Sequence, residues 1–226
     1  MIKNEHVTKV YKMGEVDLKV IKDLNLSIEY GEFIAIVGPS GSGKSTVLNR
    51  LGCLDKPTTG KVLIDDVDVT QLTTTQLAKF RGQNIGFIFQ SFNLIPVLSV
   101  YENIEYPLLM IQNLPQEERK KRIMKLLLDV DMMDQKDKFP DQLSGGQRQR
   151  VAIARALVTK PKIVFADEPT ANLDTKTSQQ IITLMRNIQR EFNTTFIFAT
   201  HDEKIVTAVD RIITIVDGII TDDRRV

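Results

Sequence analysis

The stretch from Phe33 to Leu51 constrains the fold more than any other part of the sequence. It reads FIAIVGPSGSGKSTVLNRL: an apolar run, the pattern G-x-x-x-x-G-K-[ST], and then apolar residues at helical spacing. This order predicts a strand, a glycine-rich loop and a helix, with the backbone N–H groups of the loop and the positive end of the helix facing a phosphate. A glycine-rich turn without that role would need neither the strand before it nor the helix after it.

The predicted phosphate loop divides its work among residue types. Glycines let the backbone curl inward, Lys44 reaches the β- and γ-phosphates, and the hydroxyl of Ser45 can ligate Mg²⁺. The residues expected to surround the phosphates are Gly38, Pro39, Ser40, Gly41, Ser42, Gly43, Lys44, Ser45 and Thr46.

Three further apolar runs lie downstream, separated by helix-like segments: KIVFA at 162–166, FIFA at 196–199 and RIITIV at 211–216. Runs without polar alternation are typical of strands buried on both faces of a parallel sheet. The first forty residues instead alternate polar and apolar side chains, as half-exposed antiparallel strands do. We therefore predict an α/β fold with a mostly parallel core sheet and an N-terminal antiparallel β-subdomain.

The middle of the chain, from about 92 to 142, has the pattern of a helical lobe. Apolar residues recur there at helical spacing behind the charged start PQEERKKR, and Pro115 is placed as a helix opener. Those apolar residues are Ile123, Leu126, Leu127, Val130 and Met133. We predict one domain over residues 1–226, in which this lobe is inserted between a first part (about 1–91) and a second part (about 143–226) of the core.

Composition and charge exclude several classes of function. The 30 basic and 29 acidic residues nearly cancel, and no long basic tract is present, which argues against a nucleic-acid partner. The apolar runs are far shorter than the roughly 20 residues of a membrane helix, and the start lacks the apolar core of a secretory signal. We therefore expect a cytoplasmic protein that can lie at a membrane face. The single cysteine, Cys53, excludes an internal disulfide and is expected to be a packing residue.

Two of the downstream apolar runs end in side chains that suit catalysis. Asp167 and Glu168 follow the run at 162–166, where α/β sheets place their ligands. We expect Asp167 to hold Mg²⁺ through its hydration shell and Glu168 to be the general base that polarises an attacking water. His201 follows the run at 196–199 after Thr200 and is expected to contact the γ-phosphate or that water. Adjacent acids also occur in simple turns, and a lone histidine is often only a hydrogen-bonded polar residue.

Several motifs in this order resemble the nucleotide-binding domain of ATP-binding cassette (ABC) transporters, over essentially the whole chain. They are GPSGSGKS at 38–45, Gln90 in IFQSFNLIP, LSGGQRQR at 143–150, IVFADEP at 163–169, the NLD loop ending at Asp174, and His201. The stretches LGCLDKPTTGKVLID and FQSFNLIPVLSVYENIEYPL look like the lipoprotein-releasing and macrolide-efflux branch, the LolD/MacB type. The resemblance implies an ATPase that uses Mg²⁺, dimerises head to tail and works with separate membrane subunits.

The resemblance also implies roles for single residues. Tyr11 is similar to an aromatic residue that stacks on adenine, and Gln90 to a glutamine that reaches Mg²⁺ and the water while its loop contacts the transporter. Asp174 matches a loop that crosses the dimer interface. Many family members have Ser where this chain has Ala171 or Asn172, but Asp174 is retained.

The signature LSGGQ implies the second half of an ATP site, supplied by the partner subunit. Ser144, Gly145, Gly146 and Gln147 would cover the ATP held by the phosphate loop of the other copy. Ser144 and Gln147 also form the pattern of a helix capping box, and the helix that follows would continue to about 157. Each glycine costs roughly 1 kcal/mol relative to Ala inside a helix. We therefore expect a ligand to approach the backbone closely at Gly145 and Gly146.

Alternatives within this resemblance remain open. An ABC ATPase of chromosome organisation or DNA repair would carry a long coiled coil between Gln90 and Ser144, where this chain has about fifty residues without sustained heptads. A cell-division ATPase of the same branch, which regulates cell-wall hydrolases, is not separated by sequence. The apolar segment FNLIPVL either contacts a membrane subunit or packs against the helical lobe. The transported substrate and the direction of transport are not encoded in these motifs.

Overall fold

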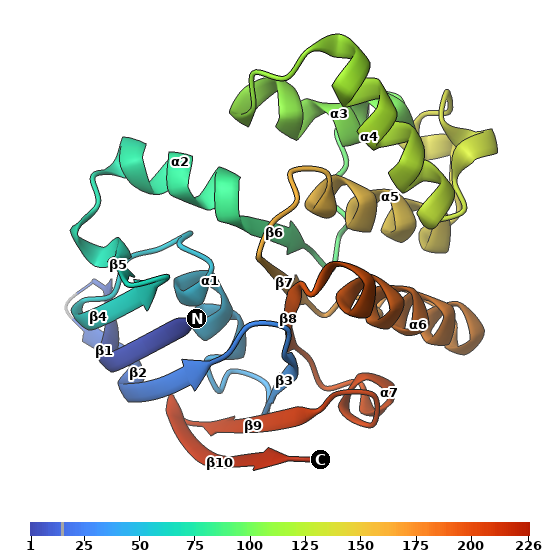
Figure 1. Ribbon diagram of the computed structural model, residues 1–226. Coiled ribbons are helices and arrows are strands. Elements are labelled where there is room, and N and C mark those ends of the chain that lie inside the picture. The colour runs from blue at the N-terminus through green and yellow to red at the C-terminus, as the bar shows by residue number, and fades with distance from the viewer. Residues whose placement is uncertain (15) are drawn as a thin grey trace.

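The computed structural model describes residues 1–14 and 16–226, which form two sheets and a helical lobe (Figure 1). The larger sheet has six strands in the order β10-β9-β3-β8-β7-β6. All neighbouring pairs are parallel except β9 and β10, which form an antiparallel hairpin at one edge. The strands are β3 (Phe33–Val37), β6 (Ile85–Ile88), β7 (Ile163–Asp167), β8 (Thr195–Ala199), β9 (Arg211–Val216) and β10 (Ile219–Arg225). The predicted parallel core is confirmed.

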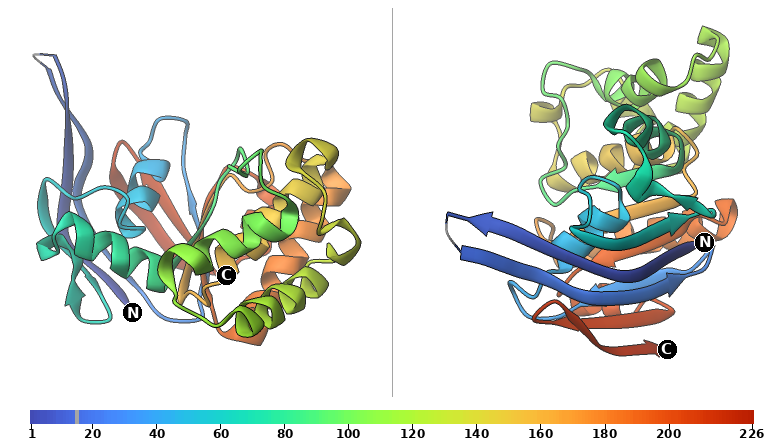
Figure 2. Two further views of the ribbon diagram at one scale, coloured as in Figure 1. Left: turned by 90° about the horizontal axis from the view of Figure 1, so that it is seen from above. Right: turned by 90° about the vertical axis from the view of Figure 1, so that its left-hand side faces the viewer.

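The smaller sheet is antiparallel and has the strand order β2-β1-β4-β5. Its strands are β1 (Ile2–Met13), β2 (Val16–Ile28), β4 (Thr59–Ile64) and β5 (Val67–Asp68). β2 alternates buried and exposed residues toward its end, as the sequence pattern predicted for a half-exposed strand. Figure 2 shows this sheet on one side of the molecule and the helical lobe on the other.

Helices cover both faces of the parallel sheet. α1 (Lys44–Leu51) packs between the two sheets, where Val47 and Leu48 share a buried core with Ile34 and Ile36 of β3. The alternate β3 residues, Phe33 and Ala35, belong to a second core on the opposite face. That second core is covered by α6 (Thr175–Phe192), the short α7 (Glu203–Val206) and the lobe. β3 is therefore continuously apolar because both of its faces are buried.

The chain between β6 and β7 forms the helical lobe, and α2 precedes β6 (Figure 1). Helix α2 spans Thr74–Asn84. The helices of the lobe are α3 (Val100–Ile111), α4 (Gln116–Asp129) and α5 (Gly145–Leu157). Two 3₁₀ turns, Met133–Gln135 and Pro140–Gln142, connect α4 to α5. α3 begins with a capping box between Ser99 and Glu102.

Helix α4 begins after Pro115, as predicted, but it ends earlier than the apolar spacing indicated. Asp131 has a left-handed backbone with φ of 56°, and the N–H of Met132 donates to the carbonyl of Leu127. This six-residue closure is a helix stop. Val130 and Met133 therefore lie beyond the helix, although both still contact the lobe core. No helix in the described ranges is long and apolar enough to span a membrane.

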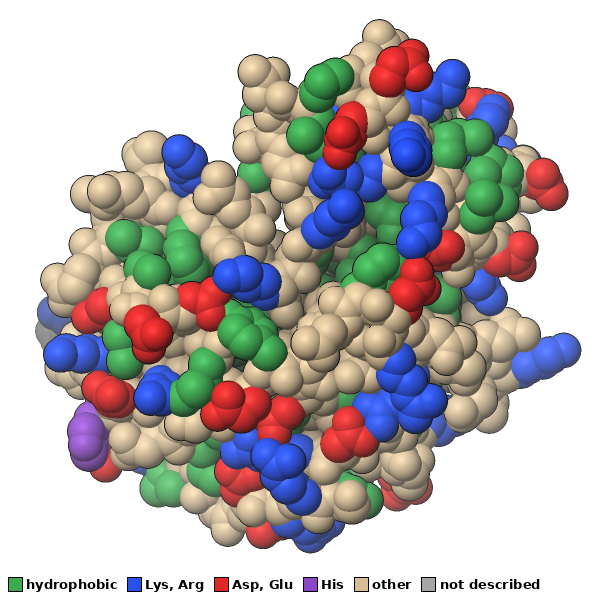
Figure 3. Space-filling view, in the orientation of Figure 1, with side chains coloured by type: hydrophobic (Ala, Val, Ile, Leu, Met, Phe, Trp, Pro, Cys, Tyr) green, Lys and Arg blue, Asp and Glu red, His purple; other side chains and the backbone are tan. Residues whose placement is uncertain are grey.

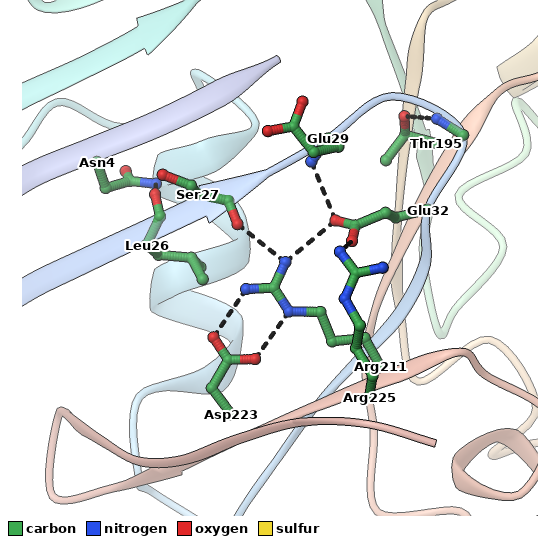
Figure 4. A network of polar contacts seen from close by, with 10 residues as sticks. Asn4, Leu26, Ser27, Glu29, Glu32, Thr195, Arg211, Asp223 and Arg225 are labelled. Atoms are coloured by element: carbon green, nitrogen blue, oxygen red, sulfur yellow. Dashed lines mark hydrogen bonds and ion pairs between the residues drawn. The ribbon is translucent and has the colours of Figure 1, made fainter.

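An ion network centred on Arg211 ties the C-terminal hairpin to β2 and β3 (Figure 4). The guanidinium donates two 2.7 Å hydrogen bonds to Asp223, one of 2.9 Å to the carbonyl of Ser27 and one of 3.1 Å to Glu32. Glu32 also accepts from Arg225 at 2.8 Å. Each carboxylate in the network thus has at least two donors, which fixes the edge of the sheet.

Candidate active site

The carboxyl ends of three parallel strands meet at one edge of the large sheet. Ile36 of β3 pairs with Ala199 of β8, and Ala199 pairs with Asp167 of β7. The phosphate-loop sequence follows β3, Glu168 follows β7, and His201 follows β8. The fold therefore brings together three motifs that are far apart in the sequence, as expected for a ligand site in an α/β protein.

The phosphate loop uses glycine where its backbone requires it. Gly41 and Gly43 have φ of 79° and 100°, a region that other residues rarely adopt. A Cβ on Gly43 would also lie 3.1 Å from the carbonyl oxygen of Val20 in β2. Lys44 donates two 2.9 Å hydrogen bonds to the carbonyls of Gly38 and Pro39, so its ammonium group is held against the loop.

A hydrogen bond of 3.0 Å joins Ser45 Oγ of the phosphate loop to Asp167 Oδ1 at the end of β7. Burial raises the pKa of Asp167, and the nearby charge of Glu168 adds to this, while Ser45 and Lys44 act in the opposite direction. A hydroxyl and a carboxylate at this distance are hard oxygen ligands of the kind that Mg²⁺ takes together with phosphate oxygens and water. No group of three His, Cys, Asp or Glu side chains suited to a metal occurs in the part of the chain that the structure describes. The Ser45 hydroxyl and the Asp167 carboxylate fit Mg²⁺ if phosphate oxygens and water complete its coordination shell.

Glu168 is held by the strand beside it. Its Oε2 accepts a 2.9 Å hydrogen bond from Thr200 Oγ1, and its Oε1 lies 2.5 Å from His201 Nδ1. Its backbone has a left-handed φ of 45°, and its N–H donates to the carbonyl of Ala199. The Glu168 side chain is 16% exposed and that of His201 is 76% exposed. A nearly buried carboxylate beside an exposed imidazole can receive a proton from a water and stay fixed in position.

Thr200 is a site residue that sequence reasoning missed. Its hydroxyl donates to Glu168 and also accepts from the N–H of Asp202. It is fully buried and lies between the predicted strand and His201. The only sequence signal was its position next to the histidine, because a threonine after an apolar run is common.

Gln90 lies two residues beyond the end of β6 and is exposed. Its carbonyl accepts a 2.9 Å hydrogen bond from Asn172 Nδ2, which connects this loop to the one that ends at Asp174. Asp174 caps α6 by accepting from the N–H and the hydroxyl of Thr177 at 3.0 and 2.6 Å. These hydrogen bonds lower the pKa of Asp174. Asp174 therefore has a role inside the subunit besides the predicted one at a dimer interface.

Tyr11 lies near the phosphate loop but is held by a separate ion cluster. In the β1–β2 ladder it is paired with Leu18, two residues from the Val20 that packs on Gly43. Its hydroxyl donates to Asp55 at 2.8 Å, and Lys9 Nζ lies 4.7 Å from its ring centroid. Burial raises the pKa of Tyr11, and the hydrogen bond to Asp55 adds to it. These contacts fix the orientation of the ring, and its stacking on adenine stays a prediction.

The signature segment begins α5, and its predicted capping box is confirmed. Gln147 N–H donates to Ser144 Oγ at 3.3 Å, and Ser144 N–H donates to Gln147 Oε1 at 2.9 Å. Within the described residues, no hydrogen bond connects this segment to the phosphate loop of the same chain.

The structure adds a second reason for glycine at Gly146, within the subunit, while the approach of a ligand there stays a prediction. A Cβ there would lie 2.5 Å from Thr177 Cγ2 of α6, so close packing within the subunit already disfavours a side chain. At Gly145 a Cβ would be 3.4 Å from Leu173 Cδ2, which is tight but tolerable. The sequence could not reveal this contact, because α5 and α6 approach each other only in the folded chain.

Cys53 is buried, and burial raises the pKa of its thiol to about 12. A thiol that stays protonated at neutral pH is a poor nucleophile. This agrees with the prediction that Cys53 is a packing residue.

Comparison with known proteins supports the resemblance to ABC transporter nucleotide-binding domains that the motifs indicated. The sequence profile of the "ABC transporter" family matches residues 21–171. The chain is 47% identical over its whole length to an uncharacterised ABC transporter ATP-binding protein, MJ0796 of Methanocaldococcus jannaschii, and covers 97% of it. A dimeric structure of MJ0796 in a post-hydrolysis state, bound to ADP and Pi, superimposes with a TM-score of 0.92 at 46% identity, covering 100% of this chain and 98% of that one.

Relatives with named systems are about equally similar. The lipoprotein-releasing ATP-binding protein LolD of Colwellia psychrerythraea is 45% identical over 91% of this chain and 79% of its own. The macrolide export protein MacB of Rhodopirellula baltica is 43% identical over the whole chain, which covers 33% of MacB. The methionine import protein MetN 1 of Bacillus thuringiensis is 44% identical over 92% of this chain and 61% of MetN 1. The fold, the motifs and these similarities together show that the chain belongs to the ABC transporter family and is one of its ATP-hydrolysing cassettes.

Proposed function

We propose that this chain is the ATPase subunit of a transporter that exports or extracts a lipoprotein, peptide or drug-like molecule through separate membrane subunits. The ATPase activity in this proposal is supported by one observation above all. The fold brings Ser45, Asp167 and Glu168 together at one edge of the sheet. The similarity to LolD and MacB over most or all of the chain supports the branch. The chain would then lie on the inner face of the cell membrane.

The residues at the sheet edge would divide the chemistry between them. The N–H groups of residues 38–46 and the ammonium of Lys44 bind the phosphates, and Tyr11 stacks on the base. Ser45 and Gln90, with Asp167 through water, hold Mg²⁺, which neutralises charge on the phosphate oxygens when bound. Glu168, oriented by Thr200, accepts the proton of the attacking water. His201 would exchange its contact with Glu168 for one with the γ-phosphate.

The site is incomplete in one subunit, which supports a head-to-tail dimer. The signature residues Ser144, Gly145 and Gly146 make no hydrogen bond to the phosphate loop within the described chain, although Ser144 is exposed. In the dimer they would cover the ATP held by Lys44 and Ser45 of the partner copy. ATP then acts as an interfacial ligand, and its hydrolysis would allow the dimer to reopen.

A hollow of about 490 Å³ between α2–β6 and the helices α3 and α5 is the surface we assign to the membrane subunit. Its lining includes Ile95, Tyr106 and Met110. Met110 is 66% exposed, and Val97, two residues after Ile95, is 79% exposed. Apolar side chains in such a hollow are typical of an interaction surface. In the FNLIPVL segment, Leu94 packs against the lobe core, as the packing alternative predicts, and contact of the exposed Val97 with a membrane subunit stays part of the proposal.

Hydrogen bonds connect this hollow to the catalytic edge. The side chain of Asn103 in α3 bonds the backbone of Ile95 and Leu98, and Arg155 of α5 donates to the carbonyl of Phe92. Asn172 holds the carbonyl of Gln90 at the other end of the same loop. A partner that moves this loop would therefore move Gln90, which is a physical route for coupling.

Capture of the membrane subunit tests the proposal. The tagged chain is purified from its native membrane in mild detergent, and the bound integral protein is identified. Met110→Glu should lose that partner, whereas Leu128→Glu should keep it, because Leu128 is similarly exposed, at 64%, but lies on α4 outside the hollow.

The partner's identity decides between the functions. A membrane subunit with a large extracytoplasmic domain supports export or extraction. A permease that works with a substrate-binding protein would contradict it and favour import, the system named for MetN 1. A partner that activates cell-wall hydrolases without moving a solute would favour the cell-division ATPase.

A further inference from the structure

A second hollow, of about 480 Å³, lies where the helical lobe meets the core. One face of α4 forms a wall, with Glu118, Lys121, Arg122, Lys125, Leu126 and Asp129 at helical spacing. The other walls come from the segment after α5 and from the end of α6. Pro161 and Thr194 stand just before β7 and β8, so this hollow opens at the edge of the sheet opposite the catalytic ends of those strands.

The floor of the hollow is apolar. Leu126, Leu157 and Pro161 are buried beneath it, and Phe192 at its side is 42% exposed. Phe192 ends α6 and carries Lys125 Nζ at 4.8 Å from its ring centroid. An exposed aromatic ring beside buried aliphatic side chains offers apolar contact to a small molecule.

The rim of the hollow carries more positive than negative charge. Arg122 is paired with Glu118 at 3.2 Å, and Lys125 with Glu191 at 3.0 Å. Lys121 and Lys160 are exposed and form no ion pair with any carboxylate among residues 1–14 and 16–226. Figure 3 shows basic side chains gathered around the junction of lobe and core, with apolar surface between them.

One acidic group in the hollow lacks a hydrogen-bond donor. Asp129 Oδ2 is buried and has no partner in the described structure. Burial raises the pKa of Asp129, Glu191 adds to this and Lys125 opposes it. A buried carboxyl oxygen without a donor is unfavourable. Oδ2 is closed to solvent, so a ligand N–H or O–H meets it when the Asp129 side chain turns toward the hollow, and that rotation would gain a hydrogen bond that the chain does not make.

We propose that this hollow binds a small amphipathic anion: an apolar body on Leu126, Leu157 and Phe192, an acidic group toward Lys121 and Lys160, and a donated hydrogen bond to Asp129. The volume suits a drug-sized molecule. Because the walls come from α4 of the lobe and α6 of the core, the bound molecule would tie these two parts together. The inference is independent of the nucleotide site and of the transporter branch.

The test uses 1-anilinonaphthalene-8-sulfonate, which combines an aromatic body, one anionic group and one N–H donor and fluoresces when its surroundings are apolar. We expect saturable binding to the full chain at one site. Lys121→Gln/Lys160→Gln should raise the dissociation constant at least about tenfold, because two charge-assisted contacts are lost. At the same dye concentration, the dye should also raise the unfolding temperature of the wild-type chain more than that of the double variant.

Lys61→Gln is the matched control, because Lys61 is an exposed lysine in β4 without an ion pair in the described residues. It should bind the dye as the wild type does. Dye binding of equal strength in the double variant would overturn the proposal, since the signal would then come from another apolar surface. Unchanged unfolding temperatures of the dye-free variants confirm that all three chains fold.

Displacement of the dye identifies the source of the anion. Dihexanoyl phosphatidylglycerol, which carries one negative charge and hydroxyl donors, represents a lipid when used below its micelle concentration, and indole-3-acetate represents a free organic acid. Competition by the first assigns the hollow to a lipid headgroup with its acyl chains, and competition by the second to a soluble metabolite. Failure of both to displace the dye would count against the proposed ligand class.

Discussion

The Arg211 network and the catalytic edge are both built from charged side chains, but they differ in how completely those charges are satisfied. Arg211 makes four hydrogen bonds, and both carboxylates that it contacts, Asp223 and Glu32, have more than one donor (Figure 4). At the catalytic edge, Asp167 accepts one hydrogen bond from Ser45. Among the described residues, Lys44 donates to two backbone carbonyls and to no carboxylate.

The pKa directions express the same difference. The hydrogen bonds from Arg211 lower the pKa of Asp223 despite its burial, whereas burial raises the pKa of Asp167. The first carboxylate is stabilised as an anion by its own chain, and the second is not. Where the chain alone does not compensate a charge, a ligand can supply the compensating charge or hydrogen bond. The comparison predicts that changes in one region affect folding and that changes in the other affect activity.

The largest effect is expected from Glu168→Gln. The amide keeps the shape of the side chain and can still accept from Thr200, but it cannot take a proton from water. ATP turnover should fall about 10²–10⁴-fold, the usual contribution of a general base. Phosphate release measures turnover, and size-exclusion chromatography should show an ATP-dependent dimer that persists. Turnover at the wild-type rate would refute the role of Glu168.

Arg211→Ala should show the reverse behaviour. It leaves Asp223 without its main partner and removes one donor from Glu32, so the free energy of unfolding should drop by about 2 kcal/mol, a value between those of exposed and buried ion pairs. Urea unfolding measures this. Turnover per folded molecule should be unchanged, because Arg211 lies at the opposite end of β9 from the phosphate loop.

The Arg211→Ala variant should also change how the free energy of unfolding depends on pH in the acid range. Because the folded pKa of Asp223 is lowered, its contribution is present above its unfolded pKa near 4 and is lost as the pH falls through the folded value. The stability difference between wild type and Arg211→Ala should therefore shrink below about pH 4. A constant difference from pH 7 to pH 3 would mean that the network acts through packing and not through charge.

A smaller and opposite change in stability is expected from Asp167→Asn. The folded pKa of Asp167 is raised, so the unfolded chain releases this proton more readily and stability falls as the pH rises through that window. The amide removes this effect, and its oxygen can still accept from Ser45. The variant should be slightly more stable than the wild type at neutral pH and should lack Mg²⁺-dependent turnover. Lower stability would show that Asp167 is compensated within the chain after all.

The extent of prediction from sequence follows from how local each feature is. The strands, the phosphate loop and the start of α4 were predictable because period and loop chemistry are local, and the strand runs fall within one residue of the observed β3, β7, β8 and β9. The end of α4 was not predictable. The helix stops where Asp131 takes a left-handed backbone conformation, and no glycine or proline stands beside this aspartate to mark the stop. Thr200, Asn172 and Thr177 were missed for a different reason. Each acts through a partner that only the fold brings near.

A change at Gly146 has the smallest expected effect on stability. It distinguishes packing within the subunit from the approach of a ligand as the reason for this glycine. Gly146→Ala places a Cβ 2.5 Å from Thr177 Cγ2, an overpacking cost of about 1–3 kcal/mol that is offset by about 1 kcal/mol of helix propensity. Thr177→Ser removes that methyl group and keeps the hydroxyl that donates to Asp174. Gly146→Ala/Thr177→Ser should therefore be at least as stable as Thr177→Ser alone, and more stable by up to about 1 kcal/mol if the overpacking is fully relieved.

The double variant then isolates the proposed contact with a second subunit. If the partner's ATP approaches the backbone at Gly146, the added methyl group should still weaken ATP-driven dimerisation and turnover, although folding is restored. Thr177→Ser alone is the control and should dimerise normally. Dimerisation and turnover at the level of that control would show that Gly146 serves only the packing of α5 on α6, and would leave Ser144 and Gly145 as the residues that cover the nucleotide.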